Sequence, residues 1–439
     1  MSNVSNGSWK EEYNRKLCTP EEAAALIRDN DVICVAGGGN VPDGFCRAFD
    51  KRLNQLHNIT VAEALAMALF DFITPASAGH SHIETVYGGV VERMCFQWGT
   101  AHYIPVHLDD TNRTIEDLDC RIIATAVTPP DENGYFNLSI GRGVLSQRIM
   151  EKAEHLIVEV NSHLPWCNSD LLLHVSQVDR IIEKDTPLFQ VPDIPITDKE
   201  KTIAGYIVDM VPDGATIQIG IGGLPNAIGS FLTSKKDLGI HTEVMTNVFM
   251  DLMISGAANG SRKNINKGKA VACLGFGDDR LNKFMDHNQD IMFFAAEYTN
   301  DSYVIGQHDN LISINNFMSI DLSGQVGSES KAHQQFTGTG GSVNFVRGAK
   351  ISNGGKSFLA ATATYTQNGE MKSRIMPMLE LGTAVTVPRT DVEYIVTEYG
   401  IARLRYKSVP KRAKALIQIA HPDFRDQLTF EAKKIGWLY

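Results

Sequence analysis

Short apolar runs alternate with polar, helix-like stretches through the first part of the chain. Residues 19–29 carry a helix-start signature, and 31–36 form an apolar run. A glycine turn at 37–39 follows, and 45–53 then have a helical pattern before a second apolar run at 59–69. This order of helix, strand, glycine turn, helix and strand predicts βα units that build a parallel sheet.

The same order of elements returns in the second half of the chain. Residues 198–210 have a helical pattern, 216–221 form an apolar run, and a glycine turn at 222–225 follows. The pattern then predicts a helix over 226–232 and a strand over 240–245. Because the elements match in kind and in order, we interpret the chain as an internal duplication of one α/β design.

A proline-rich connector separates the two halves. Pro187, Pro192 and Pro195 lie within nine residues, and proline continues neither a helix nor a central strand. We therefore predict an N-terminal domain over 1–186 and a C-terminal domain over 196–439. The predicted fold class is α/β, with two related open domains and mainly parallel sheets.

The composition is that of an ordinary globular protein, with 43% hydrophobic and 21% charged residues in a chain of 439. The net charge of −10 argues against a nucleic-acid surface, which needs a clustered basic face. The chain has no apolar run long enough for a membrane span, and 1–16 lack the apolar core of a signal peptide. These features predict a cytoplasmic protein without nucleic-acid or membrane partners.

Cysteine and histidine give little sign of metal chemistry. The seven cysteines are an odd number without a CxxC pair, so we expect reduced, mostly buried thiols rather than disulfides or a zinc site. His80 and His82 have the HxH spacing of metal ligands. They lie among small and turn-forming residues, so we interpret them as part of a solvated loop and predict no metal.

Three glycine clusters are candidates for ligand binding, at 37–39, 220–223 and 338–341. Glycine lets a backbone N–H approach a phosphate or a developing oxyanion closely. None of the clusters has the P-loop spacing or the complete GxGxxG spacing, which disfavours a P-loop and weakens a dinucleotide-binding interpretation. The chain also lacks a GxSxG elbow, which disfavours a serine hydrolase of that type.

Glu243 is the single acidic residue of the strand-like segment 240–245. A carboxylate beside a glycine-rich turn is suited to covalent catalysis, so Glu243 is our candidate nucleophile. The alternative is a solvated glutamate at a strand end beside a turn that merely reverses the chain. On these two features alone, the alternative is favoured.

Several motifs, taken together, change that balance. They resemble the acetyl-CoA hydrolase/transferase family, which belongs to the family I CoA-transferases, and they follow one another in the same order. The resemblance covers almost the whole chain and is strongest toward 4-hydroxybutyrate and butyrate CoA-transferases. The matching segments are 129–136, 158–161, 239–243, 321–326, 338–349, 396–402 and 407–425.

The resemblance implies a ping-pong mechanism through a glutamyl-CoA thioester, with Glu243 as the nucleophile. Glu398 matches a family glutamate near the CoA thiol, and Asn300 matches an asparagine that binds the substrate carboxylate or carbonyl. We expect Asn40 to face the carboxylate pocket. The oxyanion and CoA would be bound by backbone N–H groups of Gly220, Gly222, Gly223, Gly338, Gly340 and Gly341.

The resemblance further implies that CoA is a substrate, that no cofactor is bound permanently, and that the protein is a homodimer or larger homo-oligomer. We expect the active site in the cleft between the two domains. Residues 244–248 depart from the Met-Phe-Ser-Asp-Gly stretch common in relatives. This leaves open whether the carboxylate is 4-hydroxybutyrate, butyrate or itaconate, and whether the donor is acetyl-, butyryl- or succinyl-CoA.

Three other functions remain as alternatives to the transferase. An acyl-CoA hydrolase would use the same glutamate and differ only in letting water reach the intermediate. A non-catalytic acyl-CoA binding protein would use the same glycine clusters but would not need an acid beside the thioester. A dehydrogenase is weakened by the missing nucleotide fingerprint.

Overall fold

The computed structural model describes residues 8–192 and 195–439, which divide into two compact units. The first unit contains the described part of 1–191 together with 271–299. The second contains the described part of 192–270 together with 300–439. The segment 271–299 therefore packs with the N-terminal residues although it lies beyond the proline-rich connector.

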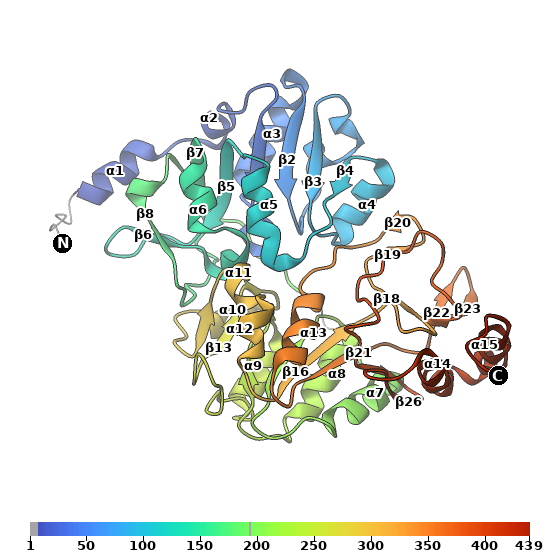
Figure 1. The fold of residues 1–439 in the computed structure, drawn as a ribbon. Helices are drawn as coiled ribbons and strands as arrows, with labels where there is room; N and C mark the ends of the chain where they lie inside the picture. Colours follow the sequence, from blue (N-terminus) through green and yellow to red (C-terminus); the bar gives the residue numbers. More distant parts are fainter. Residues whose placement is uncertain (1–7, 193–194) are drawn as a thin grey trace. The chain divides into compact units, whose positions relative to one another are not determined.

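The described residues of the first unit form a seven-stranded sheet in which all neighbours are parallel. This confirms the parallel sheet predicted from the βα pattern (Figure 1). In spatial order the strands are β4 (Ala101–Tyr103), β3 (Ser81–Thr85), β2 (Ile59–Glu63), β1 (Val32–Val35), β5 (Ile122–Val127), β7 (His155–Val160) and β9 (Arg180–Glu183).

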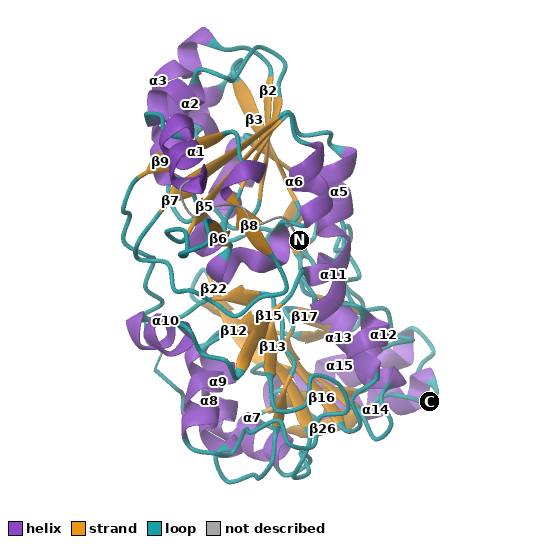
Figure 2. Ribbon diagram, turned by 90° about the vertical axis from the view of Figure 1, so that its left-hand side faces the viewer, coloured by secondary structure: helices purple, strands orange, loops and turns teal. Residues whose placement is uncertain are grey.

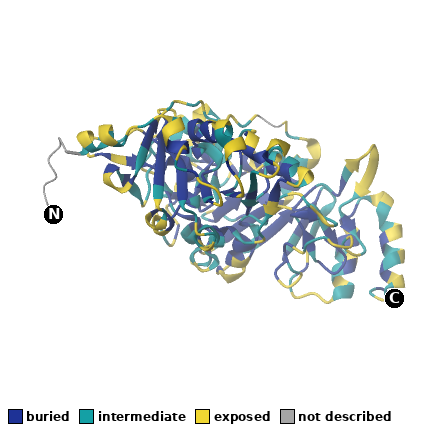
Figure 3. Ribbon diagram, turned by 90° about the horizontal axis from the view of Figure 1, so that it is seen from above, coloured by how far each residue is buried: buried dark blue, intermediate teal, exposed yellow. Residues whose placement is uncertain are grey.

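Both faces of this sheet are buried. Successive side chains of a strand point to opposite faces, and each face is covered by its own apolar core. In β1 and just after it, Ile33 and Val35 belong to one core, and Cys34 and Ala36 belong to the other. Helix α3 (Asp43–Arg52) packs on the first core, and α6 (Gln147–Lys152) packs on the second. Figure 2 shows helices on both sides of the strands, and in Figure 3 the strands of this sheet are drawn mainly in the dark blue of buried residues.

The described residues of the second unit form a six-stranded sheet with the same kind of centre. Only its last pair is antiparallel, because β25 and β26 are joined by a tight turn. In spatial order the strands are β11 (Gly239–Ile240), β10 (Thr216–Ile219), β16 (Leu311–Asn316), β21 (Lys356–Ala360), β25 (Tyr394–Thr397) and β26 (Gly400–Arg403). Helices α7 (Asp198–Val208), α8 (Gly223–Leu232) and α13 (Ser342–Ile351) belong to this unit.

The repeated element order has a counterpart in the two sheets. Strand β1 pairs with β2 on one side and with β5 on the other, and β10 pairs with β11 and with β16 in the same way. A glycine turn follows each of these strands at the point where the direction of the strand order reverses. Such switch points, at the carboxyl ends of parallel strands, are the usual ligand sites of open α/β sheets.

Two predicted strands are wrong in extent. The segment 240–245 is divided between β11 and β12 (Val244–Met245), and β12 lies outside the six-stranded sheet. Only Gly239 and Ile240 pair with β10, so the chain leaves the sheet at His241. In the same way, the apolar run that begins at Ile59 forms a strand only as far as Glu63. Leu65 then has a left-handed φ of 65°, which is incompatible with a strand.

Other expectations about the chain can be compared directly with the structure. All seven cysteines are free thiols; five are buried, while Cys18 and Cys120 are half-buried. The burial of five of the seven agrees with the predicted mostly buried thiols. Among the described residues, none of the helices combines the length and apolar character that crossing a membrane requires.

Candidate functional site

Three segments of the second unit meet at the carboxylate of Glu243. Glu243 lies between β11 and β12, directly after the buried residues His241 and Thr242. The Asn300 side-chain amide, which is fully buried, donates a hydrogen bond from Nδ2 to Glu243 Oε2 at 3.0 Å. The backbone of Gly341, at the N-terminus of α13, also hydrogen-bonds the carboxylate. The structure thus joins three residues predicted from the sequence.

The surroundings of Glu243 act on its pKa in opposite directions. The residue is half-buried, and removal of water from the carboxyl group raises its pKa above the usual range. The hydrogen bonds from Asn300 and from the backbone of Gly341 oppose that shift, because they stabilise the anion. A poorly hydrated carboxylate that is held by two donors is both oriented and reactive as a nucleophile.

Position 341 requires glycine because there is no space for a side chain, and not because of the backbone conformation. Its φ of −96° suits any residue. A Cβ at this position would lie 1.9 Å from Asn300 Nδ2 and 2.1 Å from Glu243 Oε2, so a side chain would disrupt both groups. Gly340 has a left-handed φ of 54°, which turns the chain into α13. The N-terminus of this ten-residue helix favours negative charge.

The predicted glycine turn at 220–223 forms a second helix start. Gly220 follows β10, Gly222 caps α8, and Gly223 is its first residue. Gly222 has φ 121° and ψ −171°, a conformation that is accessible almost only to glycine. Asn316 Nδ2 donates to the carbonyl of Ile221 at 3.3 Å, which fixes this turn against the end of β16. The predicted order of strand, turn and helix is confirmed, but the helix begins at Gly223, three residues before its predicted start at 226.

Glu398 lies in the turn between β25 and β26, and its side chain is 7% exposed. Its Oε2 accepts a hydrogen bond of 2.7 Å from the backbone N–H of Ala363. Lys199 Nζ lies 3.2 Å from Oε1, a distance that supports an ion pair without hydrogen-bond geometry. The contacts of Glu398 are therefore with Ala363 and Lys199, and its predicted catalytic role stays a prediction.

Asn40 belongs to the first unit and is 1% exposed. Its Nδ2 donates to the carbonyls of Ala126 and Leu138, both at 2.8 Å. These bonds hold the glycine turn after β1 against β5, which contains Ala126, and against Leu138, which directly follows β6 (Tyr135–Asn137). The side-chain Oδ1 is buried and has no hydrogen-bond partner among the described residues. The predicted contact of Asn40 with substrate stays a prediction.

A buried polar network at the carboxyl ends of β10 and β16 escaped the sequence analysis. Gln218 Nε2 donates to Asn315 Oδ1 at 3.0 Å, and Ser313 Oγ donates to Gln218 Oε1 at 3.0 Å. Gln218 lies two residues before the switch-point turn of the second unit, and Ser313 and Asn315 lie in the neighbouring strand β16. The available signal was their polarity within otherwise apolar strands, since buried polar groups require partners.

A second cluster that the sequence did not predict contacts the backbone shortly before Glu243. Lys263 Nζ donates to the carbonyls of Ile240 and Lys269 at 2.9 and 2.7 Å, and burial lowers the pKa of Lys263 to about 7. His308 Nε2 lies 3.2 Å from Nδ1 of the buried His241. Burial, together with the charge of Lys263, lowers the pKa of His308 to about 3. The sequence shows only a polar loop around Lys263.

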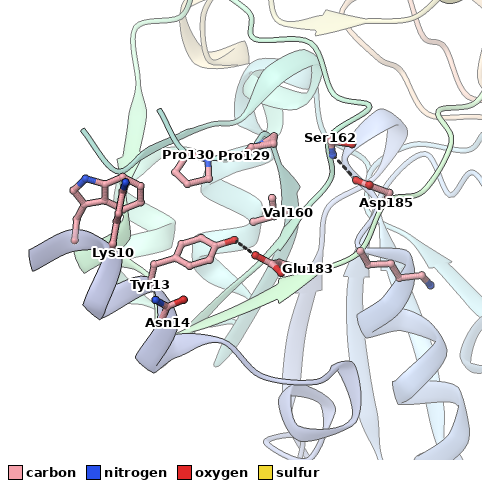
Figure 4. Close-up of a pocket in the computed structure, with 11 residues that line it drawn as sticks. Lys10, Tyr13, Asn14, Pro129, Pro130, Val160, Ser162, Glu183 and Asp185 are labelled. Atoms are coloured by element: carbon pink, nitrogen blue, oxygen red, sulfur yellow. Dashed lines mark hydrogen bonds between the residues drawn. The ribbon is translucent and has the colours of Figure 1, made fainter. Parts of the chain in front are cut away.

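A pocket of about 570 Å³ occurs in the first unit, and Figure 4 shows its lining. Tyr13 Oη donates to Glu183 Oε1 at 2.7 Å, and Asp185 Oδ1 accepts from the backbone of Ser162 at 2.7 Å. None of the residues that surround Glu243 lines this pocket. The convergence of Asn300 and the backbone of Gly341 on one carboxylate makes the surroundings of Glu243 the stronger candidate site.

Two parts of the chain match domains of one known protein family. The N-terminal domain of the acetyl-CoA hydrolase/transferase family matches residues 1–192, and the C-terminal domain of the same family matches 277–432. The chain therefore belongs to the acetyl-CoA hydrolase/transferase family. This confirms the family resemblance drawn from the motifs.

Particular relatives span nearly the whole chain. The succinyl-CoA:cyclohexane-1-carboxylate CoA transferase of Geobacter metallireducens is 40% identical over 99% of this chain and 100% of its own. The butyryl-CoA:acetate CoA-transferase of Anaerostipes caccae is 37% identical over 97% of this chain and 98% of its own. The crystal structure of RipA from Yersinia pestis covers 98% of this chain and 100% of its own, with a TM-score of 0.91 and 32% identity.

The names of the relatives bear on the choice between transfer and hydrolysis. Those that match at 34–40% identity are named CoA-transferases, and they include a 4-hydroxybutyrate coenzyme A transferase. Relatives named acetyl-CoA hydrolase match at 24–25% identity. The close relatives are thus CoA-transferases that act on acyl-CoA and short carboxylates, and the hydrolases are more distant.

Proposed function

We propose that the chain is an acyl-CoA:carboxylate CoA-transferase that works through a covalent thioester between Glu243 and CoA. The observation that carries this proposal is the convergence of Asn300 and Gly341 on one half-buried carboxylate. Two donors on a carboxylate with a raised pKa hold it ionised and aim one oxygen, as a nucleophile requires. Membership of a family whose close members transfer CoA supports the same reaction.

In the first half-reaction, a Glu243 oxygen attacks the thioester carbonyl of the acyl-CoA donor. The C–S bond breaks, CoA leaves as a thiolate, and an acyl-glutamyl anhydride remains. The thiolate then attacks the glutamyl carbonyl and releases the donor acid as a carboxylate. Glu243 is left as a thioester of CoA, so the bond energy of the donor is retained.

In the second half-reaction, the acceptor carboxylate attacks the glutamyl thioester. CoA leaves again as a thiolate, and a new anhydride forms between Glu243 and the acceptor. The thiolate attacks the acceptor carbonyl, which gives the new acyl-CoA and restores the free Glu243 carboxylate. Charge and atoms balance without metal or redox chemistry in these steps.

Each tetrahedral intermediate carries an oxyanion that needs hydrogen-bond donors. We assign this role to the helix starts at 220–223 and 338–341, where a single well-placed donor is worth about 3–4 kcal/mol in the transition state. The proposed role of Glu398 is to orient CoA, and that of Asn40 is to shape the carboxylate pocket. The proposed acceptors are 4-hydroxybutyrate, butyrate and itaconate, with acetyl-, butyryl- or succinyl-CoA as donor.

The test is capture of the thioester. The protein is mixed with each acyl-CoA donor without acceptor, treated with sodium borohydride, digested and examined by mass spectrometry. We expect reduction of the peptide that carries Glu243 and no change in Glu243→Gln, while Glu370→Gln, in an exposed hairpin, behaves like the wild type. Continued CoA exchange by Glu243→Gln, with no modified peptide in the wild type, would show that the nucleophile is another group.

A further inference from the structure

We propose that His82, Glu84 and His102 form a binding site for a divalent transition-metal ion of the zinc class. The three side chains come from neighbouring strands of the first unit, whereas Glu243 belongs to the second unit. Their ligand atoms all lie within 4.8 Å of one another. The HxH pair was predicted to lie in a solvated loop, but only His80 lies outside a strand. His82 belongs to β3.

The sheet geometry brings the three side chains to one face. His82 and Glu84 are two residues apart in β3, so their side chains point the same way. Glu84 is the register partner of His102 in β4, the strand at the sheet edge. Figure 1 shows these two strands side by side. The cluster follows from strand pairing and does not depend on the conformation of a loop.

The distances fit a shared ion. Glu84 Oε1 lies 3.6 Å from His82 Nε2 and 3.1 Å from His102 Nδ1. Ligands at about 2.0–2.1 Å from a tetrahedral zinc ion are separated by roughly 3.3–3.4 Å. Both measured separations differ from that edge by only a few tenths of an ångström, which small side-chain rotations can absorb.

The chemical types and exposure also suit a metal. Two imidazole nitrogens and one carboxylate oxygen are ligands that zinc and its neighbours prefer, and a fourth position remains for water. His102 is 58% exposed, whereas His82 and Glu84 are 31% and 23% exposed, so an ion has access from solvent. A bound ion would tie the edge strand β4 to β3.

The adjacent His80 provides a matched control. It shares the HxH pattern, but its Nδ1 lies 2.7 Å from the carbonyl oxygen of Leu56, and its ring is near that of His57. The proposed ligand set therefore includes only one histidine of the sequence pair. A site formed by the HxH pattern alone would instead need both.

The experiment measures Zn²⁺ binding to the full, tag-free, chelator-treated chain by competition with a chromophoric chelator. We expect one ion that is lost or weakened at least tenfold in His82→Ala, His102→Ala and Glu84→Gln, but retained in His80→Ala. Replacing even an outer-shell partner costs about 10–100-fold in metal affinity, so loss of a ligand should cost no less. His102→Ala lies at an exposed edge and should still fold.

A second measurement uses thermal unfolding with and without Zn²⁺. An ion that binds only the folded chain raises the midpoint, and His102→Ala should remove that rise while keeping the midpoint of the metal-free protein. Equal zinc affinity in the wild type and His102→Ala, or an equal loss in His80→Ala, would overturn the proposal. Either result would identify the cluster as an ordinary set of histidine–glutamate contacts.

Discussion

At the residue scale, opposing effects on the pKa of the Glu243 carboxyl group should set the pH range in which the proposed transferase is active. In the proposed mechanism, Glu243 must be ionised to attack a thioester, yet loss of water raises its pKa. Asn300 and the backbone of Gly341 oppose that rise. Activity should therefore fall on the acid side as Glu243 becomes protonated, at a pH set partly by these two donors.

Asn300→Ala should move the acid side of the pH profile upward. The variant loses the 3.0 Å hydrogen bond that stabilises the anion, so the pKa of Glu243 rises further and activity is lost at a higher pH. The profile of kcat/KM against pH measures the shift, and Asn54→Ala, at an exposed position, serves as the control. A uniform decrease at every pH would assign Asn300 to substrate binding alone.

Gly341→Ala should reduce kcat by at least about tenfold, because a displacement of 1 Å in a catalytic group can cost about a hundredfold. The new methyl group would occupy the space of Asn300 Nδ2 and Glu243 Oε2. Gly205→Ala is the matched control, since among the described residues no atom beyond its chain neighbours and the backbone of its own helix α7 lies within 4 Å of its Cβ position. Full activity of Gly341→Ala would mean that Glu243 works equally well in another position.

Much of the Glu243 site could be predicted from the sequence at this scale, but through motifs rather than through periodicity. Glu243, Asn300 and Gly341 are distant in the chain, and only their matches to family motifs connect them. Lys263 and His308 carry no such motif, and a lysine in a polar loop normally lies in solvent. Their burial is decided by tertiary packing, which no local pattern contains.

At the element scale, the cluster behind β11 links stability to pH. Lys263 has its pKa lowered by burial from 10.5 to about 7, so the folded chain releases this proton before the unfolded chain does. Between about pH 7 and pH 10.5 the unfolded state binds more protons at this site. The contribution of Lys263 to the free energy of unfolding therefore rises with pH across that window.

Lys263→Met should remove this rise. The urea midpoint of the wild type, relative to that of the variant, should increase from pH 7 to pH 10, because burial of the charged amine no longer costs free energy once the proton is lost. Lys236→Met, at an exposed position, should show the pH dependence of the wild type. Parallel midpoints for wild type and Lys263→Met would mean that Lys263 titrates near its ordinary pKa in the fold.

The limits of the predicted elements follow from the same local chemistry. Helix α7 agrees closely with the prediction because Thr197 and Glu200 form a capping box at its start. The predicted strand over 240–245 is interrupted because its pairing with β10 ends at Ile240, although β10 itself continues to Ile219. A sequence pattern indicates which side chains are buried but does not show whether they belong to a strand. His241 and Thr242 are buried without belonging to a strand.

At the scale of the whole molecule, the α/β class and the parallel sheets were predictable, because βα alternation permits few other arrangements. The packing of 271–299 with the first unit was not predictable. This segment joins the first unit through contacts such as Gly143 N–H to the carbonyl of Cys273 at 2.8 Å and Phe293 N–H to the carbonyl of Asn168 at 2.9 Å. Residues so distant in sequence leave no local signal of their pairing.

A fragment that ends at residue 191 should therefore fold poorly. It lacks the strand β15 (Ile291–Phe293) and the buried side chain of Cys273, so apolar groups such as Leu108 lose part of their cover. We expect broad, non-cooperative thermal unfolding of the fragment by circular dichroism, against a cooperative transition of the full chain. A sharp transition in the fragment would show that 271–299 is dispensable for this unit.

The chain passes from one unit to the other three times, after residues 191, 270 and 299. On the ribosome, domains generally complete themselves in order of emergence. Here the first unit must wait until its last segment, 271–299, has been translated, by which time residues 192–270 of the second unit have already been synthesised. The nascent protein thus exposes unfinished apolar surface during that interval, which makes it a natural client for chaperones that act on growing chains.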